Sequence, residues 1–238
     1  MFSGRMTAVL VAAGAILRDF LSAFGISVGS YTSRIGSVVD TASYSAEEIL
    51  ARSTTNALRA MTPELEDAMR CEILSAKADG DSVGGVIRCV ASGLPAGLGE
   101  PFFDTLDGEI AKAVVAVPGV KGIEFGAGFA ASAMRGSENN DSYRMEADAV
   151  RTATNNAGGI LGGMANGAEL SFAVAFKPTP SIAKAQDSVD LFAGTDAELA
   201  VRGRHDPCIA PRGAVVVEAM TIFVIADLLI RGGFACRN

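Results

Sequence analysis

The chain of 238 residues has one histidine and four cysteines, and no two cysteines form a CxxC pair. The usual ligand sets of structural and catalytic zinc are therefore missing, and we expect no metal site. An even number of cysteines could close two disulfides, but no secretory context accompanies them. Reduced thiols in a cytoplasmic protein are the expectation that fits this composition.

The chain also lacks an excess of positive charge, with 20 Lys and Arg against 27 Asp and Glu and a net charge of −7. This balance argues against a nucleic-acid partner. An acidic protein can still bind a small polyanion, but only where its few basic residues converge on one cleft.

A membrane span is not expected from either of the two long apolar runs. The run over 6–24 is interrupted by Arg18 and Asp19 and is too short to cross a bilayer, and the run over 214–230 contains two carboxylates. We expect the second run to be a buried core helix and the protein to have no membrane partner.

Both common phosphate-binding loops are absent, the GxGxxG turn after a first strand and the GxxxxGK[ST] loop. Apolar periodicity instead predicts interleaved helices and strands, and the polar stretch 137–143 is expected to be a mobile loop. The predicted helices cover 7–24, 63–77, 103–117 and 214–231, and the predicted strands cover 26–35, 83–91, 120–125, 168–176 and 198–202.

The run GRHDPC at 203–208 places Arg204, His205 and Asp206 in succession, and His205 is the only histidine. A cation, an imidazole and a carboxylate together suit anion binding combined with proton transfer. In isolation the same triplet also fits a solvated turn with a surface charge pair. Pro207 and Pro211 stiffen the chain around it.

Three further segments could approach a ligand. KPTPSI at 177–182 offers a lysine and two hydroxyls in a loop held rigid by prolines. NNAGGILGG at 155–163 has two glycine pairs that would let a planar ligand approach the backbone. SGR at 3–5 precedes a predicted helix N-terminus, which favours an anion. The alternative interpretations are, in the same order, a rigid turn, a close helix–strand crossing and a frayed terminus.

Taken together and in order, these segments resemble the chorismate synthase family over nearly the whole chain. The resemblance is carried by FSGRMTA and VAAGAI within 2–16, GDSVGG at 80–85, GLGEPFFDTLD at 97–107, VKGIEFG at 120–126, GSENND at 136–141, and then NNAGGILGG, KPTPSI and GRHDPC with the following IAPRG, at 203–213.

The resemblance implies an α+β fold, a β-α-β sandwich of the chorismate synthase type, formed as a single domain over 1–238. It implies a homotetramer with reduced FMN as cofactor, NADPH being needed only to reduce the flavin. The substrate would be 5-enolpyruvylshikimate 3-phosphate, from which a 1,4-anti-elimination of phosphate gives chorismate for aromatic amino-acid biosynthesis.

The resemblance also assigns site residues. Asp206 matches the aspartate proposed as base for the proton on the reduced flavin, and His205 would orient its neighbours. Arg5 and Arg204 match substrate-binding arginines. The cofactor-binding residues would be Ser3, Pro118, Gly119, Gly162, Lys177, Pro178, Thr179, Pro180, Ser181 and Arg204.

The N-terminus departs from the family pattern. Family members have a preceding segment with a GESHG-type motif, two catalytic histidines and several arginines, and Met1 stands where close relatives have a histidine. We therefore expect a fold that is incomplete at the N-terminus. The alternative function is a catalytically impaired remnant that still binds flavin or only self-associates.

Overall fold

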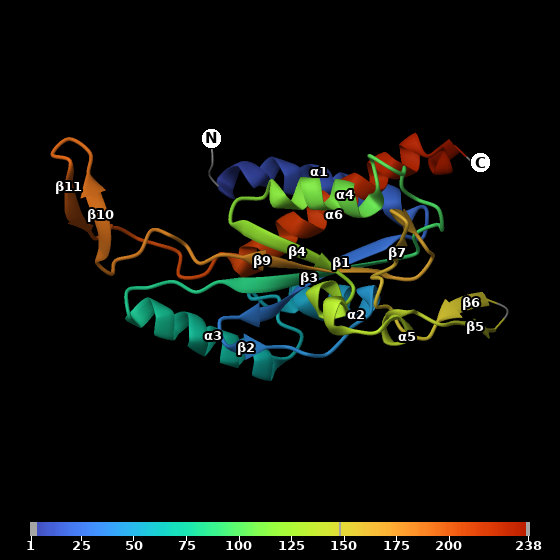
Figure 1. Ribbon diagram of the computed structural model, residues 1–238, viewed down its shortest axis with the longest axis horizontal. Coiled ribbons are helices and arrows are strands. Elements are labelled where there is room, and N and C mark those ends of the chain that lie inside the picture. The colour runs from blue at the N-terminus through green and yellow to red at the C-terminus, as the bar shows by residue number, and fades with distance from the viewer. Residues whose placement is uncertain (1–3, 148, 237–238) are drawn as a thin grey trace.

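A computed structural model describes residues 4–147 and 149–236, and its centre is one antiparallel sheet of five strands (Figure 1). The strand order is β2-β1-β3-β9-β4. The edge strand β4 therefore pairs with β9, which comes much later in the chain. The strands are β1 (Ser27–Ile35), β2 (Val38–Val39), β3 (Gly85–Ser92), β4 (Val120–Phe125) and β9 (Leu170–Phe176).

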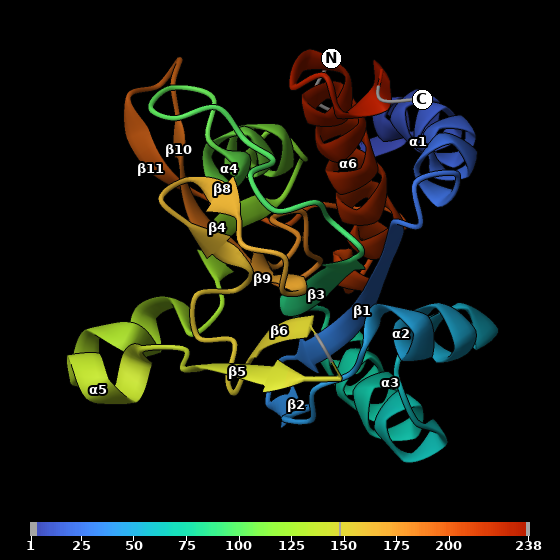
Figure 2. The ribbon, with the colours of Figure 1, turned by 90° about the vertical axis from the view of Figure 1, so that its right-hand side faces the viewer.

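Helices cover both faces of this sheet (Figures 1 and 2). One face carries α1 (Thr7–Ser22), α4 (Leu106–Val115) and α6 (Ala210–Arg231), and the other carries α2 (Ala46–Arg52) and α3 (Pro63–Ala78). Strand β1 is accordingly buried along almost its whole length, as expected for a strand with both faces covered.

The core lies between the sheet and the α1–α4–α6 layer, and α6 is buried around most of its circumference. Gly14 of α1 faces Ala219 of α6 so closely that a Cβ at position 14 would overlap the alanine side chain. Small residues at this crossing bring the two helix axes together, which positions the start of α1 beside the start of α6.

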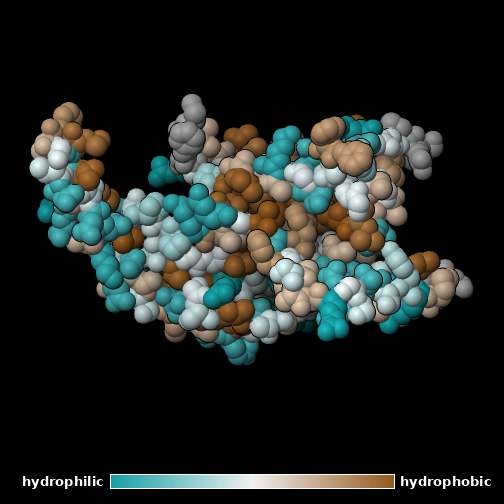
Figure 3. Space-filling model, viewed as in Figure 1, coloured by the Kyte–Doolittle hydropathy of each residue, from teal (hydrophilic) through white to brown (hydrophobic). Residues whose placement is uncertain are grey.

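Two hairpins project from this body. The hairpin of β10 (Gln186–Asp190) and β11 (Thr195–Leu199) carries exposed apolar residues at its tip, Leu191 and Phe192 (Figure 3). The second projecting hairpin consists of β5 (Tyr143–Glu146) and β6 (Ala149–Thr152). A third, shorter hairpin consists of β7 (Ile160–Leu161) and β8 (Met164–Ala165).

The antiparallel sheet and its covering helices confirm the α+β class. The sheet and the layer of α1, α4 and α6 supply one β layer and the α layer of the expected sandwich. Among the described residues, no second sheet of more than two strands covers the far side of that helix layer.

Most predicted elements are present, with three corrections. The helix expected at 103 begins at Leu106, where Thr105 accepts a hydrogen bond from the Gly108 N–H and caps it. The closing helix begins at Ala210 rather than 214, because Pro211 fits its first turn. The strand expected over 198–202 is wrong beyond Leu199; the strand is β11, over 195–199.

The loop expected over 137–143 is confirmed only at 140–142, between α5 (Gly136–Asn139) and β5. In α5, a helix of four residues, the Glu138 carboxylate accepts a hydrogen bond from the Arg135 N–H at 2.8 Å. Asp141 then accepts hydrogen bonds from the Asn156 and Ala157 N–H groups, which joins this segment to the NNAGGILGG run.

Within the described residues, α6 is the single helix long and apolar enough to span a membrane. Two thirds of its apolar window is buried against the rest of the fold, which agrees with the expected core helix.

Candidate functional site

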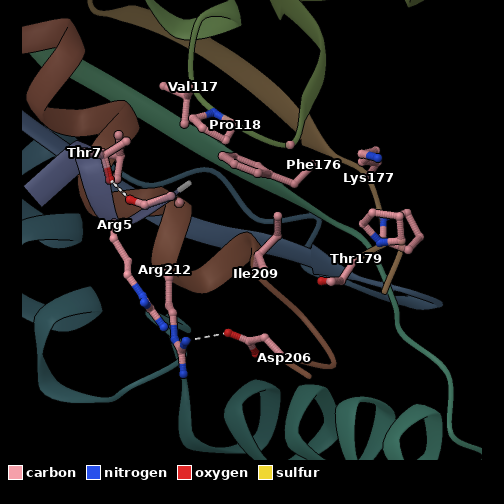
Figure 4. Close-up of a pocket in the computed structure, with 16 residues that line it drawn as sticks. Arg5, Thr7, Val117, Pro118, Phe176, Lys177, Thr179, Asp206, Ile209 and Arg212 are labelled. Carbon is pink, nitrogen blue, oxygen red and sulfur yellow. Dashed lines mark hydrogen bonds and ion pairs between the residues drawn. The ribbon is translucent and has the colours of Figure 1, made fainter. Parts of the chain in front are cut away.

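A cavity of about 610 Å³ opens where four segments meet (Figure 4). The short helix η1 (Gly4–Met6) and the first residue of α1 form one side. The connection from α4 to β4 forms a second side. The end of β9 with the KPTPSI loop, and the start of α6 with the residues before it, complete the cavity.

One wall of the cavity is apolar and is formed by side chains and by two glycines. A Cβ at Gly213 would overlap the ring of Phe176, and one at Gly119 would overlap Cδ1 of Ile209. Gly119 also has a φ of 95°, which favours glycine. The apolar lining consists of Val117, Pro118, Phe176, Ile209 and Val216.

Positive charge gathers at the same cavity although the whole chain is acidic. Arg5, Lys177 and Arg212 line it, and Asp206 is the carboxylate among the lining residues. Nη1 of Arg212 lies 2.5 Å from Oδ2 of Asp206. In Figure 4 the side chains of Arg5 and Arg212 extend in the same direction from the starts of their helices. Three cations against one carboxylate make this cavity suited to an anion.

Two hydrogen bonds to the backbone of the KPTPSI loop hold it in place. The Lys177 N–H donates to the Gly119 carbonyl at 2.9 Å, and the Ser82 hydroxyl donates to the Thr179 carbonyl at 2.7 Å. Within the described residues, Oγ1 of Thr179 is buried and has no hydrogen-bond partner. Because buried hydroxyls are nearly always paired, this atom is suited to bind a ligand group in the cavity.

The GRHDPC loop forms a second, smaller hollow of about 220 Å³ with the Gly80–Ser82 turn. Ser181, Arg204 and His205 line this hollow, and Asp206 lines both. Nε2 of His205 lies 3.0 Å from the Val201 carbonyl, so the imidazole stabilises the loop that carries Asp206.

The structure thus brings most of the sequence-predicted residues to one region. Arg5, Pro118, Gly119, Lys177, Pro178, Thr179, Pro180 and Asp206 line the larger cavity, and Ser181, Arg204 and His205 line the smaller one. Gly162 is exposed in the turn between β7 and β8, lines neither cavity, and stays a prediction. Ser3 lies outside the described residues.

Half of the cavity lining was not predicted from the sequence, including Phe176, Ile209 and Arg212. Phe176 and Ile209 occupy positions that the apolar pattern assigns to an ordinary core. Arg212 lies in the IAPRG part of the last motif, but nothing in the sequence shows that it reaches back six positions to Asp206.

Cys208, next to this site, is not suited to act as a nucleophile. Its burial, with the nearby Asp206 carboxylate acting in the same direction, raises the pKa of the thiol to about 11. Among residues 4–147 and 149–236, no group of three His, Cys, Asp or Glu side chains could hold a metal ion.

Comparison with known proteins gives one consistent result. The chorismate synthase family matches residues 1–230. A chorismate synthase of Dehalococcoides mccartyi is 49% identical over 238 residues, which cover 99% of this chain and 65% of the relative. A chorismate synthase of Methanosarcina mazei is 46% identical over 232 residues, covering 98% of this chain and 63% of the relative.

A solved structure agrees with the sequence relatives. A crystal structure of chorismate synthase matches with a TM-score of 0.80 and 31% identity, covering 97% of this chain and 65% of that one. The chain therefore spans slightly less than two thirds of the length of the relatives it matches. Because the family match extends over almost every residue of the chain, the chain belongs to the chorismate synthase family.

Proposed function

We propose that this chain carries the flavin side of a chorismate synthase active site. The reaction would be the 1,4-anti-elimination of phosphate from 5-enolpyruvylshikimate 3-phosphate to give chorismate. The observation that carries the proposal is the larger cavity, which combines an apolar wall, three cations and Asp206 within an acidic chain. Such a combination suits a planar, anionic cofactor and a polyanionic substrate.

The residues present fit FMN. Pro118, Phe176 and Ile209 would contact the apolar ring system, and Lys177 with the unpartnered Thr179 hydroxyl would bind the phosphate. FMN bound there in its reduced form would supply electron density for the departure of phosphate. NADPH would serve only to reduce the flavin.

The chain's own residues have three tasks in this proposal. Arg5 in the larger cavity and Arg204 in the adjoining smaller hollow would neutralise the anionic substrate, which lowers the barrier to departure of phosphate. The carboxylate of Asp206 would accept the proton carried by the reduced flavin, and its ion pair with Arg212 holds the carboxylate at the edge of the cavity. His205 stabilises the loop through the Val201 carbonyl.

The remaining parts of the proposal concern the whole protein. We propose one domain over 1–238, a homotetramer and a cytoplasmic location. Because the chain spans about 65% of its relatives, full activity would also require residues that the relatives have outside the matched part.

Flavin titration tests the cofactor site directly. Under anaerobic conditions the chain should bind reduced FMN, because the apolar wall and the cations are both present. It should bind oxidised FMN with lower affinity. Arg204→Ala should weaken this binding. No binding of either form at high micromolar concentration would contradict the site assignment, although not the family membership.

Turnover tests the role of Asp206. The chain alone should form little chorismate, whereas the chain extended with the unmatched part of the Dehalococcoides mccartyi relative should be active. In that extended form Asp206→Asn should lower turnover by about 100-fold or more and leave flavin binding largely intact. Asp227→Asn, at an exposed carboxylate late in α6, is the matched control. Normal turnover of Asp206→Asn would exclude Asp206 as the base.

A further inference from the structure

We propose that Arg212 is a positioning residue that holds the Asp206 carboxylate at the edge of the larger cavity and offsets its negative charge. The inference rests on the proposed function of that cavity, and it goes beyond it by giving a role to a residue to which the family resemblance assigned none. Its basis is the 2.5 Å contact between Nη1 of Arg212 and Oδ2 of Asp206.

The backbones at both ends of this ion pair are anchored. The Val83 N–H donates to the Pro207 carbonyl at 2.8 Å, and Cys208 is buried, so the chain on the C-terminal side of Asp206 is fixed. Arg212 lies in the first turn of α6 and is followed by the buried residues Gly213 and Ala214. The orientation of the Asp206 side chain is then set mainly by the guanidinium.

The exposure of the pair indicates that its role is not stability. The side chain of Arg212 is 81% exposed and that of Asp206 is 26% exposed. Exposed ion pairs contribute little to folding. The buried pairs that Glu218 forms with Arg18 and Arg59 show the contrasting case, with a carboxylate that is 3% exposed within the core.

The charge balance of the cavity gives Arg212 a specific task. Asp206 is the carboxylate among the cavity-lining residues, and an anionic ligand must approach it. Without Arg212 the carboxylate would repel that ligand and could rotate away from its position. A guanidinium both neutralises a carboxylate and fixes its orientation through a planar fork, which a lysine ammonium cannot do.

Two kinds of role for Arg212 make different predictions in a double-mutant cycle with Asp206. If Arg212 acts through Asp206, Arg212→Gln should weaken FMN binding by about 5-fold in the native background and have little effect when Asp206→Asn is already present. If Arg212 contacts the ligand directly, the two effects should be independent.

The experiment is an anaerobic fluorescence titration of reduced FMN into the native chain, Arg212→Gln, Asp206→Asn and the double variant. Arg231→Gln is the matched control, because it removes an arginine that pairs with Asp227 and Asp104 at the far end of the same helix. Circular dichroism melting should show unchanged unfolding midpoints for Arg212→Gln and Arg212→Lys.

The outcomes separate this inference from the proposed function. Coupled effects on FMN binding, with partial recovery in Arg212→Lys, support the positioning role. Equal losses in both Asp206 backgrounds, or full recovery in Arg212→Lys, overturn it and leave the flavin site standing. A native chain that binds no FMN overturns both. In the extended active form, the positioning role further predicts that Arg212→Gln lowers kcat more than it raises KM.

Discussion

At the scale of single residues, two of the charges that interrupt the apolar runs prove to be partners of each other. Arg18 of α1 and Glu218 of α6 form an ion pair, and Nη1 of Arg59 lies 2.8 Å from Oε2 of Glu218. The Ser30 hydroxyl also donates to Oε2, at 2.8 Å. One buried carboxylate therefore joins α1, β1, α6 and the segment before α3.

Glu218→Gln should destabilise the protein strongly. The change leaves two arginines without their counter-charge, one of them only 16% exposed, and breaking a buried ion pair typically costs about 3–5 kcal/mol. Urea unfolding followed by circular dichroism would measure the loss. Glu66→Gln is the control, because Glu66 pairs with Arg70 at i,i+4 on the surface of α3 and should cost about 0.5 kcal/mol or less. Equal small losses in both variants would contradict the structural role of the Glu218 cluster.

The same residues show what the sequence could predict about the site and the core. The motifs placed Lys177, Thr179 and Asp206 at a common site, because each lies in a rigid local segment with recognisable chemistry. The pairing of Arg18 with Glu218 could not be predicted, because 200 residues separate the two and only the packing of α1 on α6 brings them together. The partner of Asp206 was missed for a related reason: Arg212 was expected in a loop before the helix, whereas it lies in the helix.

At the scale of elements, long segments were predicted well and short ones were not. Pro63 and the acidic residues after it identified α3, and the alternation over 168–176 identified β9, both within two residues at each end. In contrast, α2, β5, β6 and β10 were not predicted at all. These elements are short or exposed, so hydrophobic patterning carries little of their structure.

The close approach of Gly213 in α6 to the ring of Phe176, the last residue of β9, helps to shape the cavity, and Gly213→Ala tests it. Glycine to alanine normally stabilises a helix by about 1 kcal/mol, but here the added Cβ would overlap the Phe176 ring. Since overpacking costs about 1–3 kcal/mol, we expect no gain or a net loss of stability, together with weaker FMN binding. Gly136→Ala, where a Cβ meets nothing within 4 Å, is the control. A stabilised Gly213→Ala protein with unchanged FMN affinity would show that this contact is looser than the structure indicates.

At the scale of the whole molecule, the side of α1 that faces away from the sheet presents an apolar surface. Val9 and Ile16 are 73% and 74% exposed and lie seven residues apart, on one face of the helix, and Met6 extends the same surface. Large contiguous apolar surfaces on soluble proteins generally mark contacts with other chains.

We therefore expect the chain to self-associate in solution. Multi-angle light scattering should give a mass well above the 24.4 kDa of one chain. The double variant Val9→Glu and Ile16→Lys should shift the mass toward the monomer, because two desolvated charges would oppose contact through this face. Leu191→Glu at the tip of the β10–β11 hairpin, which is also exposed, is the control for a general gain in solubility. A stable monomer of the native chain would contradict the prediction. An equal shift in both variants would mean that α1 is not the contact surface, and that the exposed hairpin contributes as much to association as the helix does.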